Sequence, residues 1–142
     1  MKKYMTKKMI IEVLRKEPLS SGSFIYHEMD DYDSIKASKC EVCAAGAVVR
    51  KAFGSKASAW DVDDYCNTNI VNAHYQNLTI EPSLANYAGY GNTDYMIRQG
   101  LYLNALSNVF EGMMKNRREA TPFVRKRLIA FVTKNFPDRI KL

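Results

Sequence analysis

Apolar side chains near both ends of the chain recur three or four residues apart, the spacing that places them on one face of an α-helix. Near the start, Thr6 is a good N-cap for a helix that runs through Lys16. Near the end, Thr121 at the N-cap and Pro122 at the first helical position predict another helix, which Pro137 closes. Both ends of the chain are therefore predicted to be helical.

The same spacing predicts three helices between these two. The first covers about residues 40–53, with Gly54 as its stop, and its run of small side chains predicts a central helix that its neighbours approach closely. Ser58 caps a second, short and acidic helix, over about residues 59–66. A third and longest helix is expected over residues 94–115.

The segments between these helices are more polar and harder to assign. Within residues 18–39, the triplet Phe24-Ile25-Tyr26 predicts either a short strand or an apolar plug. Residues 67–92 permit short strands near 70–71 and 78–80, and helical turns equally well. The fold class predicted is mainly α, with room for a minor two-stranded piece, in a single compact domain over residues 1–142.

Composition agrees with one globular domain and narrows the setting. The chain has 142 residues, 46% of them apolar and 25% charged. The longest apolar stretches, Cys43–Val49 and Leu128–Val132, are far shorter than a membrane span, and no signal peptide is apparent. Three cysteines, an odd number, suggest free thiols in a reducing compartment. We therefore expect a cytoplasmic protein without a membrane partner.

Charge is distributed unevenly along the chain. Residues 1–16 carry a net charge of +5 and residues 115–142 carry +7, whereas the residues between them carry −6. If the ends meet in space, they form one basic face of the kind that binds nucleic acid by displacing phosphate counterions. The competing interpretation is that both are helices with ordinary solvated sides. The candidate phosphate-binding residues are Lys7, Lys8, Arg125, Lys126 and Arg127.

The most conspicuous local motif is Cys40-Glu-Val-Cys43. It suggests a zinc site completed by Cys66 and His74, although a second closely spaced pair of ligands is missing. A redox pair at a helix start is another interpretation, and a small apolar packing role for Cys43 is the third. No metal or cofactor is expected under the packing interpretation.

The segment Cys40-Glu-Val-Cys43-Ala-Ala-Gly-Ala resembles the Cys-x-x-Cys-Ala-x-Gly-Ala helix of small uncharacterised bacteriophage and bacterial proteins. Those proteins also resemble this chain in layout, with an opening helix, a polar segment and a later helix like Leu106-Ser-Asn-Val-Phe-Glu111. The resemblance covers about two-fifths of the chain and brings no established chemistry. It implies an origin in a phage or mobile element and a cytoplasmic setting.

Catalytic motifs have little support in this sequence. The carboxylates of Asp61, Asp63, Asp64 and Glu81 are candidates to surround a divalent cation, and His27 and His74 are candidate general bases. However, Ser58 followed by Asp61 is also an ordinary capping box, and neither histidine lies in a recognised catalytic arrangement. We therefore expect a protein that is not an enzyme.

Tyrosine and asparagine concentrate in the middle of the chain. Six of the nine tyrosines lie between residues 65 and 102, and Tyr is enriched at binding interfaces. The leading hypothesis is a phage-type accessory protein that binds and inhibits or sequesters a host protein or protein complex, such as a defence component. Nucleic-acid binding and a zinc or redox protein are the alternatives, and a homodimer stays open. The candidate partner-binding residues are Tyr75, Tyr87, Tyr90, Asn92 and Tyr95.

Overall fold

The computed structural model describes residues 1–27, 34–71, 93–115 and 117–142. Within them the fold is mainly helical, with two small two-stranded sheets, as predicted. The elements in chain order are β1 (Tyr4–Thr6), α1 (Lys7–Lys16), β2 (Ile25–Tyr26), the 3₁₀-helix η1 (Ala37–Lys39), β3 (Glu41–Val42), α2 (Ala44–Phe53), α3 (Ala59–Cys66), the π-helical turn η2 (Asn67–Val71), α5 (Thr93–Arg98), α6 (Tyr102–Met114), α7 (Pro122–Asn135) and β4 (Arg139–Lys141).

Three helix starts follow directly from the capping residues. Thr6, Ser58 and Thr121 precede α1, α3 and α7, and each has extended backbone angles. In each case the side-chain oxygen accepts the backbone N–H three residues ahead, at 3.1 to 3.2 Å. These bonds satisfy N–H groups that a helix leaves without an internal partner. The predicted starts are confirmed.

Two predicted helices have different bounds in the structure. The prediction of a helix from residue 40 is wrong, because Cys43 has extended backbone angles and is the N-cap of α2. The prediction of one helix over 94–115 is also wrong. Gly100 has a φ of +76°, a left-handed conformation that interrupts a helix and separates α5 from α6.

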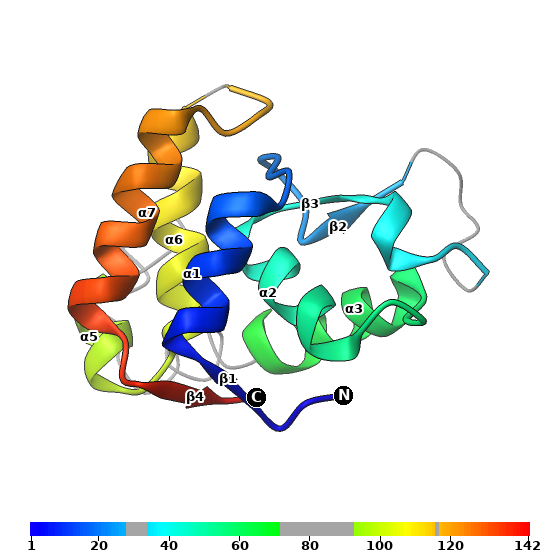
Figure 1. Ribbon diagram of the computed structural model, residues 1–142, viewed down its shortest axis with the longest axis horizontal. Coiled ribbons are helices and arrows are strands. Elements are labelled where there is room, and N and C mark those ends of the chain that lie inside the picture. Colours follow the sequence, from blue (N-terminus) through cyan, green and yellow to red (C-terminus); the bar gives the residue numbers. More distant parts are fainter. Residues whose placement is uncertain (28–33, 72–92, 116) are drawn as a thin grey trace.

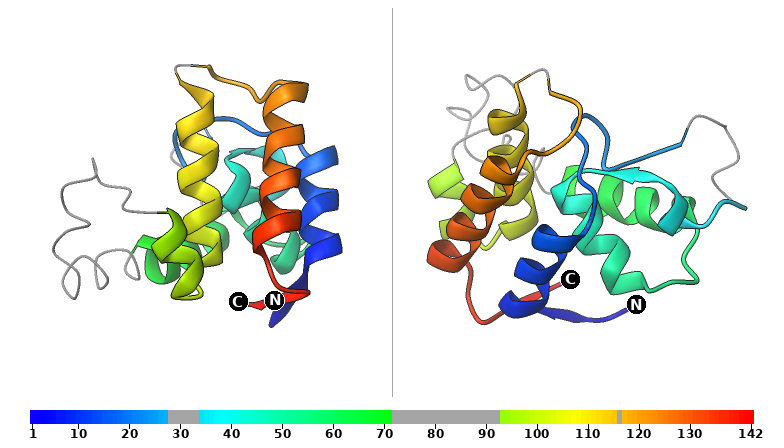
Figure 2. Two further views of the ribbon diagram at one scale, coloured as in Figure 1. Left: turned by 90° about the vertical axis from the view of Figure 1, so that its left-hand side faces the viewer. Right: turned by 45° about the horizontal axis from the view of Figure 1, so that its top comes forward.

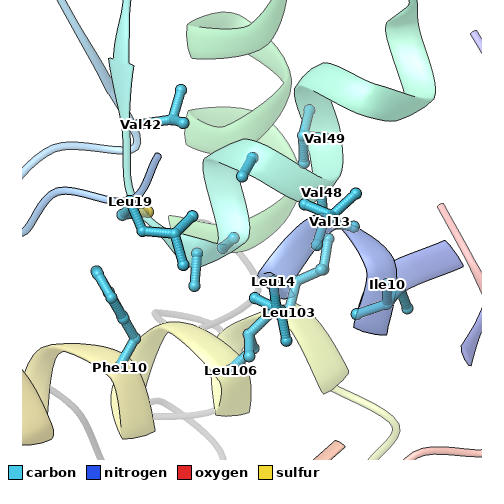
Figure 3. Packing of buried hydrophobic residues seen from close by; sticks show 14 of the residues in the cluster. Ile10, Val13, Leu14, Leu19, Val42, Val48, Val49, Leu103, Leu106 and Phe110 are labelled. Atoms are coloured by element: carbon cyan, nitrogen blue, oxygen red, sulfur yellow. The ribbon is translucent and has the colours of Figure 1, made fainter. Parts of the chain in front are cut away.

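Helices α6, α7 and α1 stand side by side, with α7 in the middle (Figure 2, left). Helix α2 packs against the inner sides of α1 and α6, and α3 packs against α2 on the side of the molecule away from α7 (Figure 1). The core lies where α1, α2 and α6 meet. Figure 3 shows Leu14 of α1, Val48 of α2 and Leu106 of α6 directed into this shared interior, and all three are fully buried.

The two sheets are small antiparallel pairs. Strand β2 pairs with β3, which confirms Ile25–Tyr26 as a strand. Strand β1 pairs with β4, so that the two ends of the chain form one ribbon. Ile70 and Val71, where short strands and helical turns were both open, lie in the π-helical turn η2. Residues 78–80 lie outside the described residues.

Gly46 allows the chain to cross closely over α2. A Cβ atom at this position would lie 1.8 Å from the carbonyl oxygen of Phe24, far inside contact distance. Ala44, Ala45 and Ala47 beside it are at most 1% exposed. The small residues therefore make α2 the central, closely approached helix, as the sequence predicts.

The replacement Gly46→Ala should lower the free energy of unfolding by about 2–3 kcal/mol, because the backbone of Phe24 must move. The matched control is Gly112→Ala in α6, where a new Cβ atom meets nothing within 4 Å. That change should leave stability unchanged or raise it by up to about 1 kcal/mol, because alanine favours the helix more than glycine does. Urea unfolding of both variants measures the difference, and equal stabilities would contradict the close approach.

Candidate nucleic-acid interface

The basic ends of the chain meet because α1 and α7 pack antiparallel to each other (Figure 1). The Lys7 ammonium donates a hydrogen bond to the Thr133 carbonyl oxygen near the end of α7, at 3.1 Å. The Arg125 guanidinium donates to the Leu14 carbonyl oxygen near the end of α1, at 2.8 Å. The C-terminal end of a helix carries partial negative charge, so each helix supplies a cation where the other one needs it.

Prolines explain why these two carbonyl oxygens are available. In a continuing helix, the N–H four residues ahead would bond to Leu14 and to Thr133. Those positions hold Pro18 and Pro137, which have no N–H. The prolines that end α1 and α7 thus leave acceptors that Arg125 and Lys7 fill from the opposite helix.

The ribbon of β1 and β4 continues this basic region. Met5 and Ile140 face each other across the ribbon and are buried, whereas Tyr4, Arg139 and Lys141 alternate with them and are exposed. The Arg139 guanidinium carbon lies 4.5 Å from the centre of the Tyr4 ring, a cation–π contact. The ribbon thereby presents an aromatic ring together with positive charge.

Two hollows lie along the exposed sides of α1 and α7, the first beside α1 and the second between the two helices. One, of about 630 Å³, is lined by Lys8, Arg15 and Lys16 of α1 and by Thr6 and Asp138 near the ribbon, among other residues. The second, of about 350 Å³, lies between the helices and is lined by Arg15 of α1 and Lys126 of α7, among other residues. We call these exposed sides the basic surface, and its exposed cations are Lys8, Arg15, Lys16, Lys126, Arg127 and Lys134.

Glu12 is an acidic side chain within the basic surface. Its carboxylate accepts a hydrogen bond from Lys16 at 2.8 Å, and this bond and charge hold the pKa of Glu12 below its ordinary value. Lys8 and Lys51 act on that pKa in the same direction. The cations around Glu12 therefore outnumber its single carboxylate, and the net charge of the region stays positive.

A second exposed aromatic ring stands among these cations. Phe123, in the first turn of α7, is 63% exposed, and the Arg127 guanidinium lies 5.5 Å from its centre. Exposed rings beside cations are the groups on which proteins stack single-stranded bases. The sequence patterns did not single out Phe123, Tyr4, Arg15 or Arg139. The signal that could have identified Phe123 is an aromatic residue two positions before the run Arg125-Lys126-Arg127.

The structure divides the five predicted phosphate-binding residues into two groups. Lys8, Lys126 and Arg127 are exposed, as a phosphate contact requires. Lys7 and Arg125 are half-buried and bond to the neighbouring helix, so their first role is structural. The sequence could not separate the groups, because the acceptors are more than 100 residues away along the chain.

The predicted partner-binding residues are mostly not described. Tyr75, Tyr87, Tyr90 and Asn92 lie outside the described residues. Tyr95 is half-buried on α5 and is engaged by a neighbouring group, so it is not a free ring. The described residues therefore do not test a binding surface made of tyrosine and asparagine.

The three cysteines are free, buried thiols. Cys40 follows η1, Cys43 caps α2 with its sulfur and Cys66 ends α3. Burial raises the pKa of all three thiols, that of Cys43 to about 12. Among the described residues, no three His, Cys, Asp or Glu side chains gather as metal ligands, and His74 lies outside them. The packing interpretation of Cys43 agrees with these positions.

The predicted acidic and imidazole groups do not assemble within the described residues. Asp61 completes the capping box of α3, accepting the Ser58 backbone N–H at 3.0 Å. Burial raises the pKa of Asp63, which lies two residues further along α3. Asp64 is exposed on the same helix, whereas His27 is half-buried and already has a bonding partner. Glu81 and His74 lie outside the described residues.

The fold and the surface together define a small, mainly helical domain with a basic face. Comparison with protein-family models, with curated proteins and with solved structures gives no match. In the described part of the chain, no helix combines the length and apolar character needed to cross a bilayer.

The replacement Arg125→Met should lower the free energy of unfolding by about 1.5–3 kcal/mol, because the Leu14 carbonyl loses a charged donor that no backbone N–H can replace. The neighbouring change Lys126→Met keeps the same helix and removes an exposed cation, so it should change stability by less than about 0.5 kcal/mol. Thermal or urea unfolding compares the two. Equal losses would show that the bond between the helices contributes nothing.

The buried thiols should be unreactive while the protein is folded. At pH 8 a chromogenic disulfide reagent should react with Cys43 and Cys66 only as fast as the protein opens, because only the thiolate attacks and both thiols are inaccessible. Addition of urea above the unfolding midpoint should release all three at once. Rapid reaction of Cys43 in the native protein would instead favour the redox interpretation of the Cys40–Cys43 pair, and rapid reaction of Cys66 would contradict its burial.

Proposed function

We propose that this protein binds nucleic acid, and single strands in preference to duplexes, through the basic surface and the adjoining ribbon. The observation that carries the proposal is the antiparallel packing of α1 and α7, which brings the basic helices at the two ends of the chain together and leaves exposed cations on both. The acidic helix α3 lies away from that side (Figure 1). Affinity of this kind comes mainly from cations that displace phosphate counterions.

The preference for single strands rests on the exposed aromatic rings. Tyr4 and Phe123 each lie beside an arginine and keep a large part of the ring exposed. A paired and stacked base offers no face to such rings, whereas an unpaired base does. The shallow hollows along α1 also suit a flexible strand that follows the surface.

The test measures binding of a labelled single-stranded 12-mer over a range of salt concentrations. The triple variant Lys8→Ser, Arg15→Ser, Lys126→Ser should bind at least tenfold more weakly at 50 mM salt. The plot of log affinity against log salt should become shallower by about 0.7 for each phosphate that the variant no longer neutralises. A duplex of the same length should bind more weakly than the single strand.

The matched control removes three exposed lysines elsewhere, with Lys36→Ser, Lys39→Ser and Lys56→Ser. This variant loses the same net charge, so a similar loss of affinity would mean that total charge and not the basic surface drives binding. Absence of any binding by the unmodified protein at 50 mM salt would refute the proposed function.

A second proposal is the phage-type accessory protein that inhibits or sequesters a host protein complex. Its support is the resemblance of the Cys40–Ala47 segment, together with one exposed group outside the basic surface. Trp60 on α3 is 51% exposed beside Asp61 and Asp64, and exposed tryptophan is common at protein interfaces. The first proposal rests on more of the described contacts, and we therefore put it first.

A further inference from the structure

A third hollow, of about 260 Å³, opens where η2, the start of α6 and strand β4 come together. It adjoins the ribbon, since Ile140, Lys141 and Leu142 form one of its walls. Tyr65, Tyr102 and the buried Asn104 also line it. This hollow is separate from the two that run along α1, with which it shares no lining residue.

Asn104 is a buried polar side chain with unused hydrogen-bonding capacity. It is only 8% exposed, and its Nδ2 donates one hydrogen bond to the Ile70 carbonyl oxygen at 2.8 Å. No group in the described part of the chain donates to its Oδ1, and the second hydrogen of Nδ2 has no acceptor there. Because buried polar groups are nearly always paired, these positions point to a ligand that supplies both partners.

The side walls of the hollow carry two tyrosine rings that neighbouring rings hold in place. Tyr102 packs against Phe136 with ring centres 5.2 Å apart, and Tyr65 packs edge-on against Phe53 at 6.0 Å. Both tyrosines are half-buried, so part of each ring stays accessible. Rings fixed in this way suit a flat heteroaromatic ligand, because little side-chain freedom is lost on stacking.

The start of α6 adds donors for an anion at the rim. Leu101 at its N-cap provides no side-chain hydrogen bond, so the first turn of this 13-residue helix is uncapped. Tyr102, Leu103 and Asn104 of that turn all line the hollow. Backbone N–H groups and the helix dipole favour a phosphate at such a position, and Lys141 is one of the residues that line the hollow.

We propose that this hollow binds one adenine nucleotide unit, with the base between the tyrosine rings and against Asn104, and its phosphate at the start of α6. Adenine presents its N6 donor beside its N7 acceptor, and these match the free Oδ1 and the remaining N–H of the asparagine amide. An unpaired thymine offers a similar pair at N3–H and O4, but the two fused rings of adenine cover more of the tyrosine rings. The inference rests on the proposed function in one respect: the unit is an unpaired base of a strand bound along the basic surface. It adds a base preference to a surface that otherwise contacts phosphates and stacks bases of any kind.

The experiment compares oligodeoxyadenylate with the same strand made of 7-deazaadenine, which lacks the N7 acceptor but keeps the ring size and the charge, by fluorescence anisotropy with the full chain. We expect about tenfold tighter binding of the adenine strand, the effect of one matched amide contact. Asn104→Ala should remove this preference and keep the affinity for the 7-deazaadenine strand. Asn69→Trp, at the exposed rim, should remove it by filling the hollow; this change gives up the hydrogen bond from Asn69 to the Tyr65 carbonyl oxygen and leaves Asn104 itself unchanged.

The matched control is Asn108→Ala, one turn further along α6, where the side chain bonds to Thr93 and does not line the hollow. This variant should keep the preference for adenine. Equal affinity of the unmodified protein for both strands would overturn the inference and leave the proposed function standing. A preference that survives in both Asn104→Ala and Asn69→Trp would overturn it as well.

If neither strand binds at 50 mM salt, the proposed function fails. Binding of the free nucleotide then tests separately whether the hollow is a nucleotide site. Adenosine 5′-monophosphate at millimolar concentration should then shift the NMR signal of the Asn104 side-chain amide in the unmodified protein. The same addition should cause no such shifts around the hollow in Asn69→Trp. Absence of the Asn104 shift in the unmodified protein would refute the hollow as a nucleotide site.

Discussion

Two reciprocal hydrogen bonds between α1 and α7 are the interaction on which the rest of the surface depends. In each of them a cation of one helix donates to a carbonyl oxygen of the other. Pro18 and Pro137 end the two helices and leave the carbonyl oxygens of Leu14 and Thr133 without a backbone donor. Arg125 and Lys7 bond to them from the opposite helix, which fixes the helices antiparallel. This direction also brings β1 beside β4. One pair of reciprocal bonds thus joins segments at opposite ends of the chain.

The same packing gives the cations of these segments two kinds of role. Those that face the neighbouring helix stabilise its carboxyl end, where partial negative charge offsets the repulsion between two basic helices. Those on the outer sides, such as Lys8 and Lys126, face solvent and are available to phosphates. Structural and binding roles are therefore assigned by the side of the helix on which a residue lies, although the residue types are alike.

The hollow beside the ribbon has its origin in a break of the backbone. Gly100 takes a left-handed conformation, so the long apolar pattern divides into α5 and α6. The division creates a helix start in the interior of that pattern, with Leu101 as an N-cap that offers no side-chain hydrogen bond. Asn104 then lies in the first turn of α6, buried against η2. A continuous helix would have paired those backbone groups within itself.

By itself, the sequence determined the features that depend on neighbours a few residues apart: the caps at Thr6, Ser58 and Thr121, and the close approach to α2. It left Ile25–Tyr26 open between a strand and an apolar plug, and pairing with β3 decided for the strand. The sequence predicted helix bounds less well where such signals compete, as at Cys40–Cys43 before α2 and at Gly100 between α5 and α6. Only the tertiary structure decided that the basic ends meet, and that Lys7 and Arg125 serve the fold while Lys8 and Lys126 face solvent. The reason is that these contacts join residues more than 100 positions apart, whose distance no local pattern encodes.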